Sequence, residues 1–155
     1  LLDVDARPQV RHQCGERTLD VATRAYADNG VDAELMPYIE DMAEVYAWAD
    51  LVVCRSGALT VAELCAVGLP ALLVPYPAAV DDHQTENAAA MVDANAAAII
   101  QEQDLTPNSL QRLLREWLQS RATLLQRAER ARSLARPESL SRITHLCLQQ
   151  AGATL

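Results

Sequence analysis

Short apolar runs alternate along the chain with longer segments in which apolar residues recur at helical spacing. The strand-like runs are residues 10–14, 34–36, 51–54, 71–74 and 97–100. The helical segments are residues 16–29, 41–49, 58–67 and 84–94, followed from residue 107 by two or three amphipathic helices broken at Ser120 and Pro137. This alternation predicts an α/β fold in which helices cover a doubly wound, Rossmann-like parallel sheet.

The clearest local pattern spans residues 51–74. An unbroken apolar run over 51–54 is typical of a parallel strand that is buried on both faces. The tripeptide Arg55-Ser56-Gly57 then leads into a helical segment, which Gly68-Leu69-Pro70 ends before the next strand. Strand, glycine turn, helix, Gly/Pro stop and strand together predict a βαβ crossover.

Composition narrows the classes of function. The 155 residues are half apolar and show no repeat or low-complexity linker, so we expect one domain over residues 1–155. A net charge of −8 argues against a general nucleic-acid or anionic-membrane binder. The four cysteines show no short regular spacing, so we expect reduced thiols, no metal site and no cofactor.

The strongest candidate for chemistry is the run from Arg55 to Glu63. It lies at the carboxyl end of a parallel strand and opens a helix, which is where open α/β sheets bind ligands. The first backbone N–H groups of that helix, from Ala58, Leu59 and Thr60, would face an anion such as a diphosphate. A purely structural alternative is that Ser56 or Thr60 caps the helix, with Thr60-x-x-Glu63 forming a capping box.

A second candidate follows the next strand and therefore lies on the same edge of the sheet. In the run 82–87, Gln84 and Asn87 are three residues apart and share a helix face. Side-chain amides offer both a donor and an acceptor, which suits sugar hydroxyls. The alternative is an ordinary helix start with Asp82 as N-cap.

Seven short motifs, taken in order, resemble one known family. They are His12-Gln13-x-Gly15, Tyr38-Ile39-x-Asp41-Met42, Tyr46-Ala47-x-Ala49-Asp50, Cys54-Arg55-Ser56-Gly57-Ala58-Leu59-Thr60, Gly68-Leu69-Pro70-Ala71, Val74-Pro75-Tyr76-Pro77 and Asp82-His83-Gln84-x-x-Asn87-Ala88. From about residue 7 to the final helix, the chain resembles the C-terminal, donor-binding half of the bacterial peptidoglycan N-acetylglucosaminyltransferases of glycosyltransferase family 28.

The resemblance implies an inverting enzyme of the GT-B architecture, in which two Rossmann-like domains face each other across a cleft. The whole enzyme would transfer GlcNAc from UDP-GlcNAc to undecaprenyl-diphosphate-MurNAc-pentapeptide, converting lipid I to lipid II at the cytoplasmic face of the inner membrane. This half would hold the donor, and the other half would hold the lipid-linked acceptor and make the peripheral membrane contact.

The resemblance also assigns residues to parts of the donor. The backbone of Ile39, beside the aromatic ring of Tyr38, would read the uracil. Ala58, Leu59 and Thr60 would lie over the diphosphate, and the Glu63 carboxylate would take the ribose hydroxyls. The GlcNAc would lie along His83, Gln84 and Asn87, while Arg55 and Ser56 belong to the same substrate-binding motif.

Two departures from the family pattern matter. The family's first strand of this domain with its glycine-rich loop, and its whole acceptor domain with the proposed catalytic base, have no counterpart here. We therefore expect a soluble donor-binding fragment that holds no catalytic residue and is inactive alone. Two other functions stay open: a stand-alone UDP-GlcNAc-binding subunit that recruits a membrane partner, and half of a GT-B-like UDP-sugar epimerase.

Overall fold

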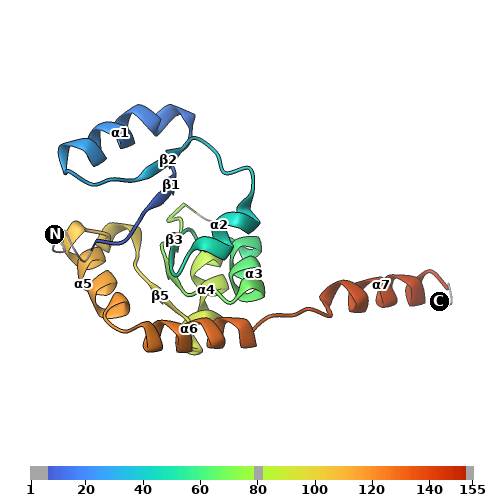
Figure 1. Ribbon diagram of the computed structural model, residues 1–155. Coiled ribbons are helices and arrows are strands. Elements are labelled where there is room, and N and C mark those ends of the chain that lie inside the picture. The colour runs from blue at the N-terminus through green and yellow to red at the C-terminus, as the bar shows by residue number, and fades with distance from the viewer. Residues whose placement is uncertain (1–6, 79–81, 153–155) are drawn as a thin grey trace. The chain divides into compact units, whose positions relative to one another are not determined.

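The computed structural model describes residues 7–78 and 82–152 and divides the chain into two compact units. Unit 1 ends at Trp48, and unit 2 begins at Ala49. Figure 1 shows the helices and strands of each unit. Because the two units are separate bodies, each is described on its own.

Unit 1 is built around two parallel strands. Its elements are β1 (Arg11–Gln13), the 3₁₀ turn η2 (Glu16–Thr18), α1 (Leu19–Asp28), β2 (Glu34–Met36) and α2 (Met42–Trp48). β1 pairs with β2 so that His12 lies opposite Leu35, and α1 makes the crossover between them. Gly30, just after α1, has a φ of +59°, the left-handed conformation in which glycine commonly ends a helix.

Unit 2 holds a three-stranded parallel sheet with helices between and after its strands. Its elements are β3 (Val52–Cys54), α3 (Ala58–Val67), β4 (Ala71–Leu73), α4 (His83–Asp93), β5 (Ala97–Ile99), the 3₁₀ turn η4 (Glu102–Asp104), α5 (Pro107–Leu118), α6 (Arg121–Ser133) and α7 (Ser139–Gln150). The strand order is β3-β4-β5, with Val53 opposite Leu72 and Leu72 opposite Ala98.

β4 is the centre of the unit 2 core. Ala71, Leu72 and Leu73 are fully buried. Successive strand residues point to opposite faces, and Leu72 packs in a cluster with Trp117 of α5 and Leu124 of α6. Ala71 and Leu73 therefore face the other side, so both faces of β4 are covered. Burial on both faces was predicted for residues 51–54, and there the prediction is wrong, because Val53 of β3 is 47% exposed and Val52 and Cys54 are only half-buried.

The end of α3 packs closely on α6. Gly68 ends α3 with a φ of +74°, and a side chain there would begin 3.0 Å from the Arg132 Cβ and 3.2 Å from the Ala128 carbonyl oxygen. The Arg132 guanidinium also donates a hydrogen bond to the Ala66 carbonyl, one of the last carbonyls of α3. Close approach and helix-end capping thus fix α3 at its C-terminal end.

The elements confirm the predicted order of strands and helices, with two differences. Residues 16–18 form a 3₁₀ turn before α1 rather than its first turn. The described residues from 107 onward form three helices with breaks at Ser120 and Pro137, as predicted. All strands are parallel as predicted, but their hydrogen bonds form a two-stranded and a three-stranded sheet, one in each unit. Among the described residues, no helix is long and apolar enough to cross a membrane.

Candidate functional site

The N-terminus of α3 is the centre of the candidate site. Gly57 is its N-cap in an extended conformation, with φ −62° and ψ 147°. The Val61 N–H donates to the Gly57 carbonyl at 2.9 Å, which makes it the first donor of the helical ladder. The N–H groups of Ala58, Leu59 and Thr60 precede that ladder and are directed along the helix axis at its positive end. This geometry suits an anion.

The capping interpretation of this motif is wrong. Gly57 is the N-cap of α3, and no side-chain oxygen caps the helix. Thr60 is the third residue of the helix, so Thr60 and Glu63 cannot form a capping box at its start. Glu63 lies further along α3, on the exposed surface of the helix. The helix start is therefore open to a ligand rather than closed by its own side chains.

Arg55 and Ser56 connect β3 to this helix, and both terminal nitrogens of the Arg55 guanidinium contact other groups of the protein. The Arg55 guanidinium donates to the carbonyls of Val74 and Pro75 at 3.3 and 3.0 Å and forms an ion pair with Glu102. Ser56 is 0% exposed, and its hydroxyl has no hydrogen-bond partner in the described part of the chain. Contact between Ser56 and a ligand would require this turn to move.

The start of α4 is joined to both neighbouring turns by amide side chains. The Tyr76 N–H donates to the Gln84 side-chain carbonyl at 2.9 Å. The Asn87 amide nitrogen donates to the Ser56 carbonyl at 3.1 Å. Each amide thus uses one of its two polar ends within the protein, which leaves the Gln84 amide nitrogen and the Asn87 carbonyl oxygen to be considered for a ligand. His83 is exposed at the first position of the helix.

Asp82 starts α4 differently from the expected N-cap. It has a φ of +55°, and its carboxylate accepts a hydrogen bond from the Thr85 hydroxyl at 2.7 Å rather than capping a backbone N–H. The left-handed conformation is unusual for a residue other than glycine, and aspartate is among those that tolerate it. It turns the chain sharply into the helix at the edge where His83 and Gln84 lie.

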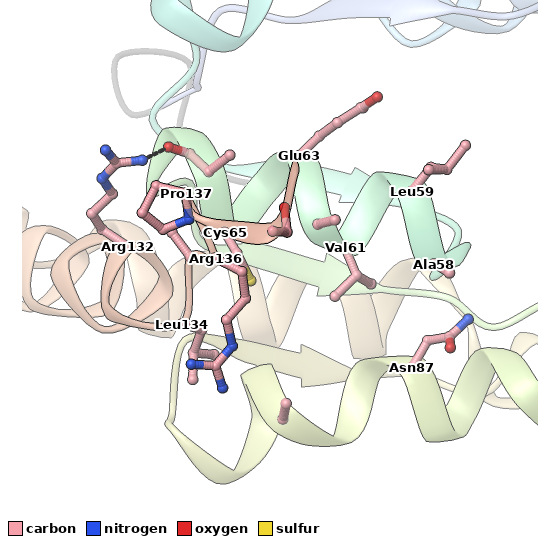
Figure 2. Close-up of a pocket in the computed structure, with 15 residues that line it drawn as sticks. Ala58, Leu59, Val61, Glu63, Cys65, Asn87, Arg132, Leu134, Arg136 and Pro137 are labelled. Carbon is pink, nitrogen blue, oxygen red and sulfur yellow. Dashed lines mark hydrogen bonds between the residues drawn. The ribbon is translucent and has the colours of Figure 1, made fainter. Parts of the chain in front are cut away.

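A groove of about 640 Å³ runs beside α3 and α4, and its other side is lined by residues from the end of α6 to the start of α7. Of the predicted residues, its lining includes Ala58, Leu59, Glu63 and Asn87. Figure 2 shows Leu59 and Glu63 extending from α3 and Asn87 from α4. No sequence pattern indicated a site role for the lining residues from the end of α6 to the start of α7, which are Arg132, Leu134, Ala135, Arg136, Pro137 and Ser139. The helix break at Pro137 was predicted from the sequence, but the packing of this segment beside α3 and α4 was not.

Tyr38 and Ile39 belong to unit 1, just after β2. The Tyr38 side chain is 69% exposed, whereas Ile39 is buried. The Ile39 N–H donates to the Gln13 side-chain carbonyl at 3.0 Å, which ties the turn after β2 to the end of β1. The Ile39 N–H is thus already used inside the protein, and its carbonyl is the backbone group left to read a base.

The cysteine beside the site is not a nucleophile at neutral pH. Cys54 ends β3, and burial raises the pKa of its thiol to about 11. The thiol therefore stays protonated, and it is the thiolate that reacts. Among the described residues there is also no group of three or more His, Cys, Asp or Glu side chains placed to hold a metal ion.

Comparisons with known proteins agree with the resemblance. The model of the glycosyltransferase family 28 C-terminal domain matches residues 3–143. The chain is 53% identical over 146 residues to the UDP-N-acetylglucosamine–N-acetylmuramyl-(pentapeptide) pyrophosphoryl-undecaprenol N-acetylglucosamine transferase of Marinobacter nauticus, covering 94% of the chain and 40% of that protein. It is also 53% identical to the protein of the same name from Xanthomonas axonopodis pv. citri, over 93% of the chain and 34% of that protein.

A solved structure shows the same fold. The crystal structure of Acinetobacter baumannii MurG matches 89% of the chain with a TM-score of 0.84 and 41% sequence identity. The match covers 42% of the MurG chain. The likeness confirms the predicted Rossmann-like domain of a GT-B glycosyltransferase. The chain spans between about one third and two-fifths of the length of these relatives.

Proposed function

The chain belongs to the glycosyltransferase family 28 C-terminal domains, and we propose that it is the donor-binding half of an inverting N-acetylglucosaminyltransferase that uses UDP-GlcNAc. The observation that carries this proposal is the open N-terminus of α3 at the carboxyl end of β3. There, three backbone N–H groups precede the helical ladder and no side chain caps them. A diphosphate supplies the anionic oxygens that such a helix end binds.

In this proposal the start of α3 also contributes to the chemistry. Transfer of the sugar breaks its bond to the diphosphate, and negative charge develops on the departing UDP. The N–H groups of Ala58, Leu59 and Thr60 are held in place by the helix before the reaction begins. Donors aimed in advance at a developing charge stabilise the transition state without reorganisation.

The remaining parts of the donor are assigned to three groups of residues. We assign the ribose hydroxyls to the Glu63 carboxylate, which lies in the groove beside α3. The uracil is assigned to the Ile39 carbonyl and the exposed ring of Tyr38. The GlcNAc is assigned to the start of α4, where the Gln84 amide nitrogen and the Asn87 carbonyl oxygen are the polar ends not bonded to Tyr76 and Ser56.

The acceptor and the membrane contact lie with the part of the relatives that this chain does not span. We propose that the natural protein transfers GlcNAc to undecaprenyl-diphosphate-MurNAc-pentapeptide, the step from lipid I to lipid II in peptidoglycan synthesis. The names of the relatives, which specify this transferase, support the assignment. The protein would then work as a peripheral protein at the cytoplasmic face of the inner membrane, where such a lipid-linked acceptor is available.

Calorimetric titration of the chain with UDP-GlcNAc, UDP and uridine tests the donor assignment. We expect UDP-GlcNAc and UDP to bind and uridine to bind far more weakly, because uridine lacks the diphosphate that α3 holds. ADP is the matched control: it keeps the diphosphate but loses the uracil, so its affinity should fall below that of UDP. A folded sample that binds none of these nucleotides at millimolar concentration would contradict the proposal.

A further inference from the structure

Arg55, in the turn after β3, makes four contacts with two other turns at the carboxyl edge of the unit 2 sheet. One nitrogen of its guanidinium donates to both the Val74 and the Pro75 carbonyls, which follow β4. Its other terminal nitrogen pairs with the Glu102 carboxylate, which follows β5. The guanidinium carbon also lies 5.4 Å from the centre of the Tyr76 ring. A residue that follows β3 is thus bonded to the ends of β4 and β5.

Only an arginine side chain can make this set of contacts. The guanidinium is planar and carries five N–H donors in a fixed fork, whereas a lysine ammonium is a point charge. The side chains of Arg55 and Glu102 are 47% and 44% exposed, so their charge attraction alone contributes little to stability. The value of the arrangement is therefore geometric: one rigid group fixes the relative positions of three turns.

The turns that Arg55 holds are the turns that carry the proposed donor site. Tyr76, whose ring Arg55 contacts, donates its backbone N–H to the side chain of Gln84. Ser56, next to Arg55 in the chain, accepts from the side chain of Asn87 and precedes the N-cap of α3. A shift of Arg55 would therefore move both the start of α3 and the amides at the start of α4.

We propose that Arg55 and Glu102 are positioning residues of the donor site, and that Arg55 does not bind the diphosphate itself. The proposal rests on the donor function argued above. Glu102 belongs to none of the motifs recognised in the sequence, and its part is to hold the Arg55 guanidinium over the turn after β4. The pair acts through Gln84 and through the start of α3, so it affects the binding of the sugar as well as that of the diphosphate.

Removal of the Glu102 carboxylate shows whether Arg55 positions the site or binds the ligand, because the two roles predict opposite changes in donor affinity. If Arg55 bound the diphosphate, loss of the competing carboxylate would free the guanidinium and tighten donor binding. If the pair positions the turns, loss of Glu102 loosens them and weakens donor binding. We expect Glu102→Ala to weaken UDP-GlcNAc binding by about three- to tenfold, and Glu102→Gln, which keeps one acceptor oxygen, by less.

The experiment measures UDP-GlcNAc and UDP affinities by calorimetry in the natural protein that contains this chain. The variants are Glu102→Ala, Glu102→Gln, Arg55→Lys and the double variant, each checked by circular dichroism for an unchanged fold. Asp50→Asn is the matched control, because it breaks an exposed ion pair with Arg121 that lies outside the site turns. Because Gln84 is displaced, the loss of affinity should be greater for UDP-GlcNAc than for UDP. The double variant Arg55→Lys/Glu102→Ala should bind UDP-GlcNAc no more weakly than Arg55→Lys alone, because the two residues act through one contact.

Each outcome decides the proposal. Tighter UDP-GlcNAc binding by Glu102→Ala would make Arg55 a phosphate ligand and overturn it. Unchanged binding by folded variants would overturn it as well, while leaving the donor function intact. A wild-type protein that binds no UDP-GlcNAc would overturn the donor function and this proposal together. If Glu102→Ala fails to fold, Glu102→Gln gives the same test: the proposal predicts weaker UDP-GlcNAc binding, with a smaller loss for UDP, and tighter or unchanged binding would overturn it.

Discussion

The Gly57→Ala substitution places a single methyl group at the N-terminus of α3, where we propose that the diphosphate binds. Gly57 has φ −62° and ψ 147°, a conformation that alanine adopts without strain. The nearest atom that the new Cβ would meet is the Thr60 hydroxyl oxygen at 3.7 Å, an ordinary contact. Neither the backbone nor the packing of the protein therefore requires glycine here, so a requirement for glycine would come from the ligand.

The expected magnitudes separate folding from binding. Alanine reduces the freedom of the unfolded chain, which stabilises the protein by about 0.4–1 kcal/mol. Alanine is also a poorer N-cap than glycine, and this opposes the gain by a similar amount. The net change in the free energy of unfolding should thus stay within about 1 kcal/mol. A methyl group forced against a bound diphosphate costs about 1–3 kcal/mol, so UDP affinity should fall by about 5- to 150-fold.

Thermal unfolding and calorimetric titration with UDP test this pair of expectations, and Gly68→Ala is the matched control. Gly68 has a φ of +74°, and its Cβ would lie 3.0 Å from the Arg132 Cβ. Gly68→Ala should therefore lower stability by about 2–4 kcal/mol while leaving the UDP affinity of the folded protein unchanged. A Gly57→Ala variant that binds UDP with wild-type affinity would refute the reasoning, because nothing would then approach the start of α3 closely.

Other variants and the chain itself give further tests. Glu63→Ala should weaken UDP-GlcNAc binding by about 1–3 kcal/mol in titrations and change stability by about 1 kcal/mol or less; a lowered melting temperature with unchanged affinity would contradict its ligand role. Gln84→Ala should weaken binding of UDP-GlcNAc but leave that of UDP nearly unchanged, and an equal loss of UDP would show that this turn does not read the sugar. Ser56→Ala should raise stability in urea by about 1 kcal/mol, because it removes a buried hydroxyl that lacks a partner; a clear loss of stability would reveal a bond made by that hydroxyl. The 155-residue chain alone should transfer no GlcNAc to a lipid-linked acceptor analogue, because it lacks the wall that would orient the acceptor, and measurable transfer would disprove the half-site account.

Local patterns were sufficient to predict most elements. The bounds of α3 follow from a glycine turn before it and from Gly68 after it, and both signals act within a few residues. The division of the strands into a two-stranded and a three-stranded sheet was not predicted, because the pattern of apolar runs shows which segments form strands but not which strands are hydrogen-bonded to each other.

The parts of the site that sequence could not predict depend on contacts between distant residues. Nothing near Arg55 in the sequence indicates that its guanidinium pairs with Glu102 or bonds to the Val74 and Pro75 carbonyls. Likewise, the spacing of Gln84 and Asn87 places them on one helix face but does not show that each uses one end of its amide within the protein. A motif identifies which residues a site needs, and the fold determines which of their polar groups are already engaged.

Amide chemical-shift mapping tests the central claim most directly. The chain of 16.9 kDa is small enough for its backbone amides to be followed by NMR during titration with UDP and then with UDP-GlcNAc. We predict that both ligands shift the amide signals of Ala58, Leu59 and Thr60, and that only UDP-GlcNAc shifts the side-chain amide signals of Gln84 and Asn87. Saturating UDP that leaves the three amides at the start of α3 unshifted, or shifts confined to other parts of the chain, would contradict the claim that this helix end binds the diphosphate.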